Sequence, residues 1–328
     1  MDPSGRAPAP EQPSGPQPMR ASMVIEVSLR VLRRGWATAL VLALLFAGPG
    51  ALLTAAMSIR FSGVALDIFP SISEGLLDDT AMLTAAQLER LVGALAGYLV
   101  ATIVAGLLGS VGAVAFGAMV LADYRGQPAA LGPALTTGLR RTPSVVAFVL
   151  VTTGIVVGMA IAAGAAIMLS LTLLSSGAID RGGPGVFVAL VVLVSLVVGI
   201  AYLTVRWALA FPLMAVEDAG WRAALSRSWY LSGDNVWRVV LIVVLGGLAT
   251  NLGAALVAQL LSIVFVDLLA APAGLDTTIA ESFAIAVGSM LLAPLAPVLL
   301  AVLCLDLKVR RDGRTEVLRE GPSATEGQ

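Results

Sequence analysis

Six long apolar segments decide what this chain can fold into. A hydrocarbon core of about 30 Å is crossed by about 20 helical residues, and each segment is long enough to cross it. The segments are residues 36–59, 91–121, 145–174, 186–205, 236–264 and 279–307. We therefore predict an all-α, polytopic membrane protein of about six transmembrane helices. Pro49, Pro294 and Pro297 are expected to kink the helices that contain them.

The composition supports this class and argues against several kinds of site. Hydrophobic residues make up 58% of the chain and charged residues 12%, whereas soluble domains carry roughly a quarter charged residues. The chain has no histidine, and Cys304 is its only cysteine. Internal disulfides, Cys/His metal sites and Ser-His-Asp or Cys-His catalytic sets are therefore excluded. A net charge of −1 argues against nucleic-acid binding. We expect no metal site, no cofactor and no catalytic residue.

The basic residues alternate between the two ends of the predicted helices. One set of segments carries Arg20, Arg30, Arg33, Arg34, Arg125, Arg140, Arg141, Arg206, Arg222, Arg227, Arg238, Lys308, Arg310, Arg311 and Arg314. The opposite set carries only Arg60, Arg90 and Arg181. Because arginine-rich loops stay in the cytoplasm, we predict a multi-pass plasma-membrane protein with both termini cytoplasmic. Lys308 is the only lysine among twenty basic residues, a bias typical of a GC-rich, bacterial genome.

Two polar tails flank the apolar region. Residues 1–20 are rich in Pro, Gly and Ser and are predicted to form a disordered cytoplasmic tail. Residues 21–311 are predicted to form the six-helix transmembrane domain, and residues 312–328 a second disordered cytoplasmic tail.

A weak internal repeat lies on the predicted cytoplasmic side. A shift of ninety positions places Leu131, Ala134, Leu135 and Leu139 onto Trp221, Ala224, Leu225 and Trp229. At 100° per residue each set gathers on one helical face, which we expect to face lipid in the membrane interface. The segment that ends in Arg33-Arg34 resembles both copies. We predict three units, each a surface helix followed by a transmembrane hairpin.

The segment 206–238 is the most distinctive stretch between two predicted helices. It combines arginines, tryptophans, Pro212 and a Ser-Gly-Asp-Asn turn. One interpretation is an interfacial loop with arginines at phosphates and tryptophans at headgroup depth. The other is a docking or gating element that contacts a lipid headgroup or a partner. The candidate residues are Arg206, Pro212, Glu217, Arg222, Arg227, Trp237, Arg238 and, at the end of the last helix, Asp306.

A bridge between charges is a specific hypothesis for this region. Arg206 and Asp306 both lie near the inner ends of their predicted helices. Arg206 can reach the interface alone, and Asp306 can pair with Lys308 or Arg310. Alternatively, an Arg206–Asp306 or Arg206–Glu217 bridge locks the cytoplasmic face.

The same segment resembles a known family. Its pattern is an arginine, then proline and glutamate, Ala-Leu-x-Arg-Ser, a glycine turn and Trp-Arg. In this chain the pattern is formed by Arg206, Pro212, Glu217, Ala224-Leu225-Ser226-Arg227-Ser228, Gly233 and Trp237-Arg238, with a similar Asp-Leu-Lys ending from Asp306. It resembles the bacterial polytopic membrane domain named for its fusion to glycerophosphodiester phosphodiesterases, which also occurs alone. The fused enzyme uses histidines and metal-binding acids, so the resemblance implies no phosphodiesterase activity here.

Three functions fit these observations. The leading hypothesis is a non-catalytic scaffold or accessory subunit for envelope or lipid-related membrane proteins, with membrane lipids and other membrane proteins as partners and no nucleic acid. The alternative is a transporter or permease-like component for a lipid or small amphiphile. An intramembrane enzyme comes third, because acids and serines are present without a usable arrangement.

Overall fold

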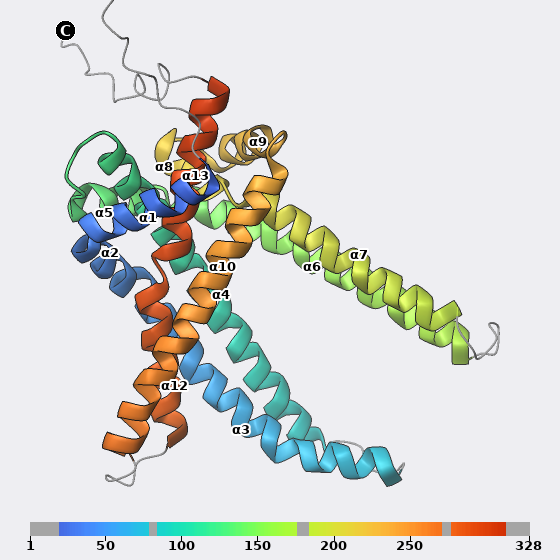
Figure 1. Cartoon of the computed structure of the whole chain (residues 1–328). Helices are drawn as coiled ribbons and strands as arrows, with labels where there is room; N and C mark the ends of the chain where they lie inside the picture. Colours follow the sequence, from blue (N-terminus) through green and yellow to red (C-terminus); the bar gives the residue numbers. More distant parts are fainter. Residues whose placement is uncertain (1–19, 79–83, 176–183, 271–276, 313–328) are drawn as a thin grey trace, which may run out of the picture.

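The computed structural model describes residues 20–78, 84–175, 184–270 and 277–312. These residues form helices and no strand (Figure 1). Six of the described helical stretches are long and apolar enough to cross a membrane, which confirms the predicted all-α polytopic class. The predicted tails, 1–20 and 312–328, lie outside the described residues except for Arg20 and Asp312.

Three helical hairpins carry the six spans. In the first hairpin, α2 (Trp36–Leu42), η1 (Ala43–Ala47) and α3 (Gly48–Asp78) form one span and α4 (Ala85–Tyr124) the other. The second hairpin is α6 (Thr142–Ser175) with α7 (Pro184–Trp207). In the third, α10 (Val236–Ser262) and η2 (Ile263–Ala270) form one span, and α12 (Thr277–Leu292) with α13 (Leu295–Asp312) forms the other. The first and last described residues, at the start of α1 and the end of α13, lie at the same end of the molecule (Figure 1).

The prolines interrupt the helices where the sequence predicts kinks. Pro49 has no backbone N–H to donate, and the turn just before it is the π-helical segment η1. Pro294 lies in the break between α12 and α13, so the last span is two helices. Pro297 lies in the first turn of α13, where the missing N–H removes no helical hydrogen bond. Pro297 therefore causes no kink of its own, and the last span is interrupted once, at Pro294.

Four short helices lie at the end of the molecule where the described chain starts and finishes (Figure 1). They are α1 (Ala21–Arg34), α5 (Leu131–Arg140), α8 (Ala210–Val216) and α9 (Trp221–Ser232). We call these helices, together with the C-terminal half of α13, the head. Helices α1, α5 and α9 each precede one hairpin, which confirms the predicted three-unit arrangement.

The three surface helices bury equivalent positions. α5 and α9 begin ninety residues apart, and in all three helices the fourth and eighth residues are buried. These pairs are Val24 and Ser28, Ala134 and Gly138, and Ala224 and Ser228. The prediction that this face meets lipid is wrong: Ala134 and Ala224 belong to the predicted face and are buried, and Trp221 and Leu225 pack partly buried against the protein core. The surface helices are therefore docked on the protein by their small residues.

Each unit is closed by an ion pair between a residue at or just after the end of its surface helix and a residue at or near the end of its returning span. The pairs are Arg34 with Asp123 at 3.8 Å, Arg141 with Asp218, and Asp234 with Arg311. The charges are reversed in the third unit. The repeated position of these pairs indicates that each hairpin is fixed at the same place, at its head end.

Helix α13 is the central element of the head. It contacts α1, α4, α8, α9 and α10, and nearly every residue from Val298 to Lys308 is buried. Of the most apolar 18 residues in the span 277–312, 56% are buried inside the protein, compared with 6% in the span 190–216. The hydrophobic core is therefore concentrated around α13, within the head and the adjoining turns of the spans.

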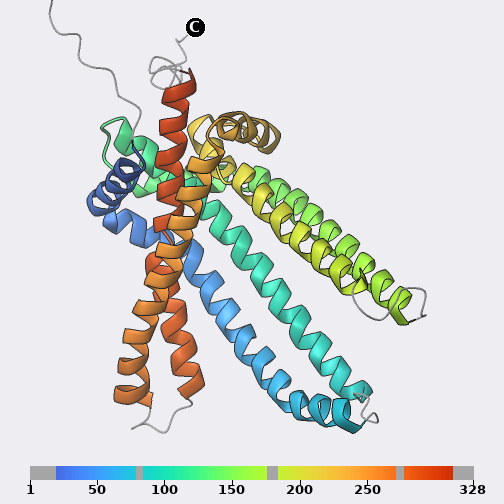
Figure 2. The same cartoon turned by 45° about the vertical axis from the view of Figure 1, so that its right-hand side comes forward.

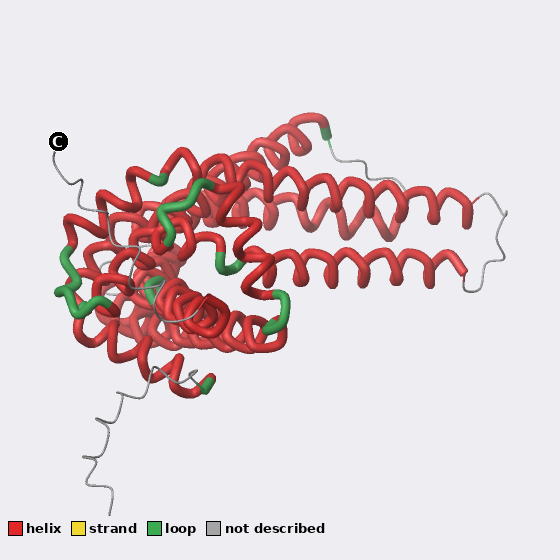
Figure 3. Tube along the Cα trace, turned by 90° about the horizontal axis from the view of Figure 1, so that it is seen from above, coloured by secondary structure: helices red, strands yellow, loops and turns green. Residues whose placement is uncertain are grey.

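Away from the head the hairpins splay apart. Figures 1 and 2 show the α6/α7 hairpin diverging from the other two, and Figure 3 shows it extending sideways when the molecule is seen from above. The first and third hairpins contact each other through α3 and α12. The α6/α7 hairpin meets α4, α5, α9 and α10, and most of its described outer side chains are exposed.

Close helix contact in the third hairpin depends on Gly288. A Cβ at this position would lie 2.7 Å from the carbonyl oxygen of Ala254 and 3.0 Å from the amide nitrogen of Ala258. Gly288→Ala should therefore destabilise the protein by about 1–3 kcal/mol through overpacking, measured as a lower unfolding temperature in mild detergent. Gly247→Ala on α10 is the control, because a Cβ there meets nothing within 4 Å. Equal stability of the two variants would contradict the close packing of α10 and α12.

Candidate functional site

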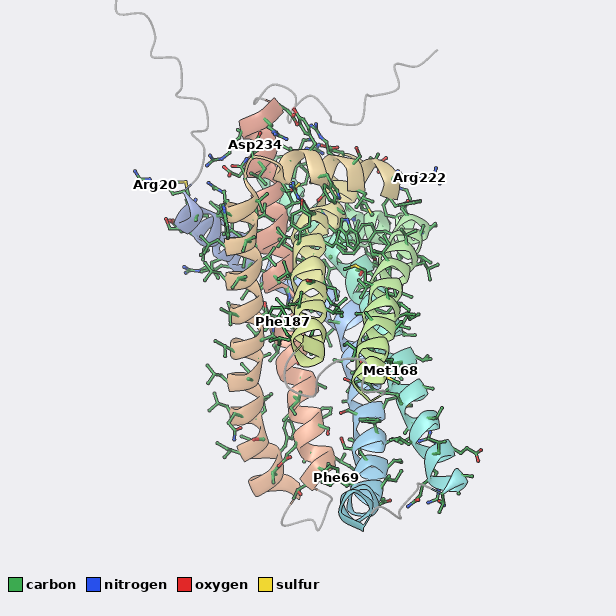
Figure 4. All side chains as sticks on the ribbon, turned by 90° about the vertical axis from the view of Figure 1, so that its right-hand side faces the viewer. Arg20, Phe69, Met168, Phe187, Arg222 and Asp234 are labelled. Atoms are coloured by element: carbon green, nitrogen blue, oxygen red, sulfur yellow. The ribbon has the colours of Figure 1, made fainter. Side chains whose placement is uncertain are left out.

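The residues singled out in segment 206–238 meet the end of α13 inside the head. The turn after α7 leads into α8, whose last residue precedes Glu217, and α9 then runs back across the head to the start of α10. Figure 4 shows Arg222 and Asp234 at the two ends of this α9 region, at the opposite end of the molecule from Phe69. Two carboxylates, Glu217 and Asp306, organise the charges found there.

Glu217 lies at the centre of the first group. Its Oε1 is 3.2 Å from Nε of Arg227 and 2.9 Å from Nζ of Lys308. The side chain of Lys308 is only 2% exposed and that of Glu217 16% exposed, so this pair is almost removed from solvent. Arg227 also pairs with Asp312. This group joins α8, α9 and α13.

The electrostatic environment keeps Arg227 charged. Burial by itself lowers the pKa of Arg227, but the hydrogen bond to Glu217 and the negative charges of Glu217 and Asp312 outweigh that effect. The resulting pKa lies above the ordinary value for arginine. Arg227 is therefore held in place as a permanent cation, although the sequence places it on a polar outer face.

Asp306 organises the second group. Its Oδ2 is 2.9 Å from Nη2 of Arg238 and 3.0 Å from Nε of Arg310, and its side chain is 2% exposed. The pairing with Arg310, one helical turn away, is one of the partners expected from the sequence. The pairing with Arg238 joins the start of α10 to α13. A buried carboxylate held by two arginines fixes these two helices at one register.

The proposed Arg206–Asp306 and Arg206–Glu217 bridges are wrong. Arg206 instead donates from Nε to the Tyr202 hydroxyl at 3.1 Å, and from Nη1 to the Ser232 hydroxyl at 3.2 Å and the Trp229 carbonyl at 3.4 Å. The reason is geometric: α7 meets α9 at its head end, whereas Asp306 faces α10 and Glu217 faces α13. Arg206 therefore belongs to a separate, aromatic environment.

The remaining predicted residues have different surroundings. Pro212 is buried in the first turn of α8, and the Cα of Pro212 would lie 3.3 Å from a Cβ placed on Gly117 of α4. The Arg222 guanidinium lies 5.0 Å from the ring of Trp221. Trp237 is 85% exposed. Pro212 is thus a packing residue, and neither Arg222 nor Trp237 belongs to the two carboxylate groups.

Sequence reasoning missed a third charge group in the head. Asp218 receives hydrogen bonds from Arg140 and Arg141, at the end of α5. Its φ of +52° lies in a region that few residues other than glycine adopt. Beside it is a cavity of about 830 Å³ whose lining includes Arg125, Thr137 and Arg140. The run Glu-Asp-Ala-Gly after α8 was the available signal for a tight turn, but it does not identify the partner.

This arrangement defines a multi-pass α-helical membrane protein whose spans are joined by an ion-paired head. Residues 185–319 match the family model described as the membrane domain of glycerophosphoryl diester phosphodiesterase, which confirms the resemblance inferred from the sequence. No curated protein and no solved structure matches the chain. The match is to the membrane domain and not to the catalytic domain of that enzyme. It covers α7 to α13, and so includes both carboxylate groups.

The stability of the head should depend on the charge of Glu217. Glu217→Gln removes the negative charge that Lys308 and Arg227 both contact, and breaking a buried ion pair costs about 3–5 kcal/mol. We expect Glu217→Gln to lower the unfolding temperature in detergent strongly. The double variant Glu217→Gln/Lys308→Met should lose less stability than the sum of the losses in the two single variants.

The control for this cycle is Glu26→Gln. Glu26 and Arg30 form an exposed pair one turn apart on α1, and such pairs contribute about 0.3–0.5 kcal/mol. Strict additivity of the Glu217 and Lys308 losses would show that the two charges act independently and that the pair does not hold the head together.

Proposed function

We propose that this protein is a non-catalytic accessory or scaffold subunit that binds envelope- or lipid-related membrane proteins through the α6/α7 hairpin. The supporting observation is that this hairpin is attached at the head and exposes apolar side chains along its length. The most exposed of these are Leu150, Ile161, Met168, Phe187, Val197 and Val198. Figure 4 shows Met168 and Phe187 on this hairpin, away from the head. Such a hairpin offers surface that the rest of the described chain does not cover.

A stripe of small residues on α6 favours a helical partner over bulk lipid. Gly154, Gly158, Ala162 and Ala165 share one face at helical spacing and are all exposed. Gly154 and Gly158 form a GxxxG pair, and a Cβ on either would meet nothing within 4 Å, so the described part of the chain does not use this pair for its own packing. In membranes, such stripes let two helices approach closely, whereas lipid chains gain nothing comparable from a missing side chain.

A transport component is the rival function. The cavity of about 830 Å³ beside Asp218 lies in the head, so the cavity that bears on a path between the spans is a second, smaller one. An apolar cavity of about 210 Å³ lies between the first hairpin, α8 and α13, with Phe46, Phe116, Phe211 and Leu300 in its lining. Binding sites for small molecules occupy about 300–1,000 Å³, so this cavity is small for a lipid or an amphiphile. The accessory role therefore has the better support.

We further propose that the head faces the cytoplasm of a bacterial plasma membrane. The arginine-rich segments come together in the head, including Arg33, Arg140, Arg227 and Arg310. Positively charged segments are retained on the cytoplasmic side. This orientation places both ends of the chain in the cytoplasm.

Cysteine labelling tests the orientation. A cysteine replacing Ser71 or Asp276 should react with a membrane-impermeant thiol reagent on intact cells, while one replacing Ser226 on α9 should react only after the cells are opened. Cys304 is buried, so background labelling should be low. Labelling of the Ser226 position from outside would reverse the proposed topology.

The small-residue stripe tests the partner. A photoreactive amino acid at position 158 should cross-link to one particular membrane protein. Gly154→Ile/Gly158→Ile should reduce co-purification of that same protein at least about tenfold, because the bulky side chains keep the helices apart. Gly164→Ile is the matched control, since Gly164 is also exposed and open but lies off the stripe.

Three outcomes would contradict the proposal. Cross-links to lipid alone would mean that no helix docks on the stripe. Cross-links between copies of this chain would indicate self-association in place of an accessory role. An equal loss of co-purification in Gly164→Ile would show that the stripe has no special part in binding.

A further inference from the structure

Arg206 is held in a cage of neutral groups at the head end of α7. Its guanidinium carbon lies 5.2 Å from the ring centre of Tyr202 and 5.0 Å from that of Trp229. The hydroxyl of Ser232, a fully buried residue, accepts a hydrogen bond from Nη1. The hydroxyl of Ser228, also buried, donates to the Arg206 carbonyl oxygen at 2.5 Å. Both the side chain and the backbone of Arg206 are therefore fixed in position.

The charge of Arg206 is not neutralised by these contacts. Within the described part of the chain, its partners are two hydroxyls, one carbonyl and two aromatic rings. The hydrogen bonds use Nε and Nη1, which leaves the two N–H donors of Nη2 for another acceptor. The neighbouring arginines Arg227 and Arg238 differ, because each is paired with a carboxylate. Arg206 is thus a preorganised cation that offers donors to an anion.

An apolar stripe on α7 begins directly at this cage. Tyr202, Val198, Val194, Val191 and Phe187 follow one another at helical spacing and are between 44% and 66% exposed. The stripe spans about 22 Å at 1.5 Å per residue, which is longer than one leaflet of a 30 Å hydrocarbon core. In Figure 4, Phe187 lies on α7 well away from the head. The positively charged Arg206 cage therefore lies at one end of an apolar stripe along which a hydrocarbon chain can pack.

We propose that the Arg206 cage binds the phosphate of an anionic phospholipid, with an acyl chain lying along the α7 stripe. Arginine donors suit phosphate oxygens, and an uncompensated positive charge favours a lipid with net negative charge over a zwitterionic one. The adjoining apolar stripe favours a diacyl lipid over free phosphate, which would gain nothing from it. This site is separate from the small-residue stripe of α6, so it does not depend on the proposed function.

Native mass spectrometry of the full chain in mild detergent tests this site. The protein is exposed to an equimolar mixture of dioleoyl phosphatidylglycerol and dioleoyl phosphatidylcholine, and the retained lipids are counted. The wild type should retain one phosphatidylglycerol in clear preference. Arg206→Gln should lower its retention at least about tenfold, because hydrogen bonds from a charged donor are the stronger kind.

Two variants separate loss of the site from loss of the fold. Arg222→Gln is the matched control, because Arg222 is also an arginine stacked on a tryptophan of α9 but lies outside the cage; it should bind as the wild type does. Tyr202→Leu removes one wall and one hydrogen bond from an exposed position, and should weaken retention severalfold without unfolding the protein. Tyr202→Leu therefore tests the cage even if Arg206→Gln does not fold.

Several results would overturn the proposal. Wild-type protein that retains the two lipids equally would remove the preference for an anionic headgroup. Equal retention by Arg206→Gln and Arg222→Gln, or undiminished retention by Tyr202→Leu, would place any bound lipid elsewhere. Displacement of phosphatidylglycerol by millimolar inorganic phosphate would indicate a site for a free anion and not for a lipid.

Discussion

The contact between the Glu217 carboxylate and the Lys308 ammonium is the interaction on which the head depends. Both side chains are nearly removed from solvent, where an unpaired charge would be costly. Lys308 can be buried at the end of α13 because Glu217 lies at the end of α8, and Glu217 is positioned because Arg227 of α9 binds it as well. The three helices are thus placed by one carboxylate. The surrounding apolar core then forms around α13.

The interactions that position the spans differ from those that position the helices of the head. In the hydrocarbon core, burying apolar surface between helices gives no hydrophobic gain, because lipid is equally apolar. The α6/α7 hairpin therefore needs few contacts with the other two, and its low burial follows. In the head, water competes for every charge, so position is set by paired and buried ionic groups. Stability and specific shape are concentrated where the chain meets water, and surface for other molecules is left in the membrane.

The sequence predicts the spans well because length and apolarity alone determine them. The ninety-residue repeat also identifies α5 and α9, since their first residues, Leu131 and Trp221, are ninety apart. The partner of Asp306 is predictable only in part: Arg310 lies one turn away on the same helix, but Arg238 requires knowledge that α10 packs beside α13. The pairing assumed for Arg206 fails for the same reason. The periodicity within a helix can be read from a single sequence, but which other helices pack against that helix cannot.

The one-ended attachment of the α6/α7 hairpin gives it the mechanics of a lever. Helix α7 has 24 residues, so it is about 36 Å long at 1.5 Å per residue. A rotation of about 5° at the head would move its far end by roughly 3 Å over that length, while the ion pairs near its base shift much less. A small rearrangement around Asp218 or Arg206, which lie near the base of the hairpin, would therefore be amplified at its far end. No comparable amplification is available to the other two hairpins, because α3 and α12 brace each other.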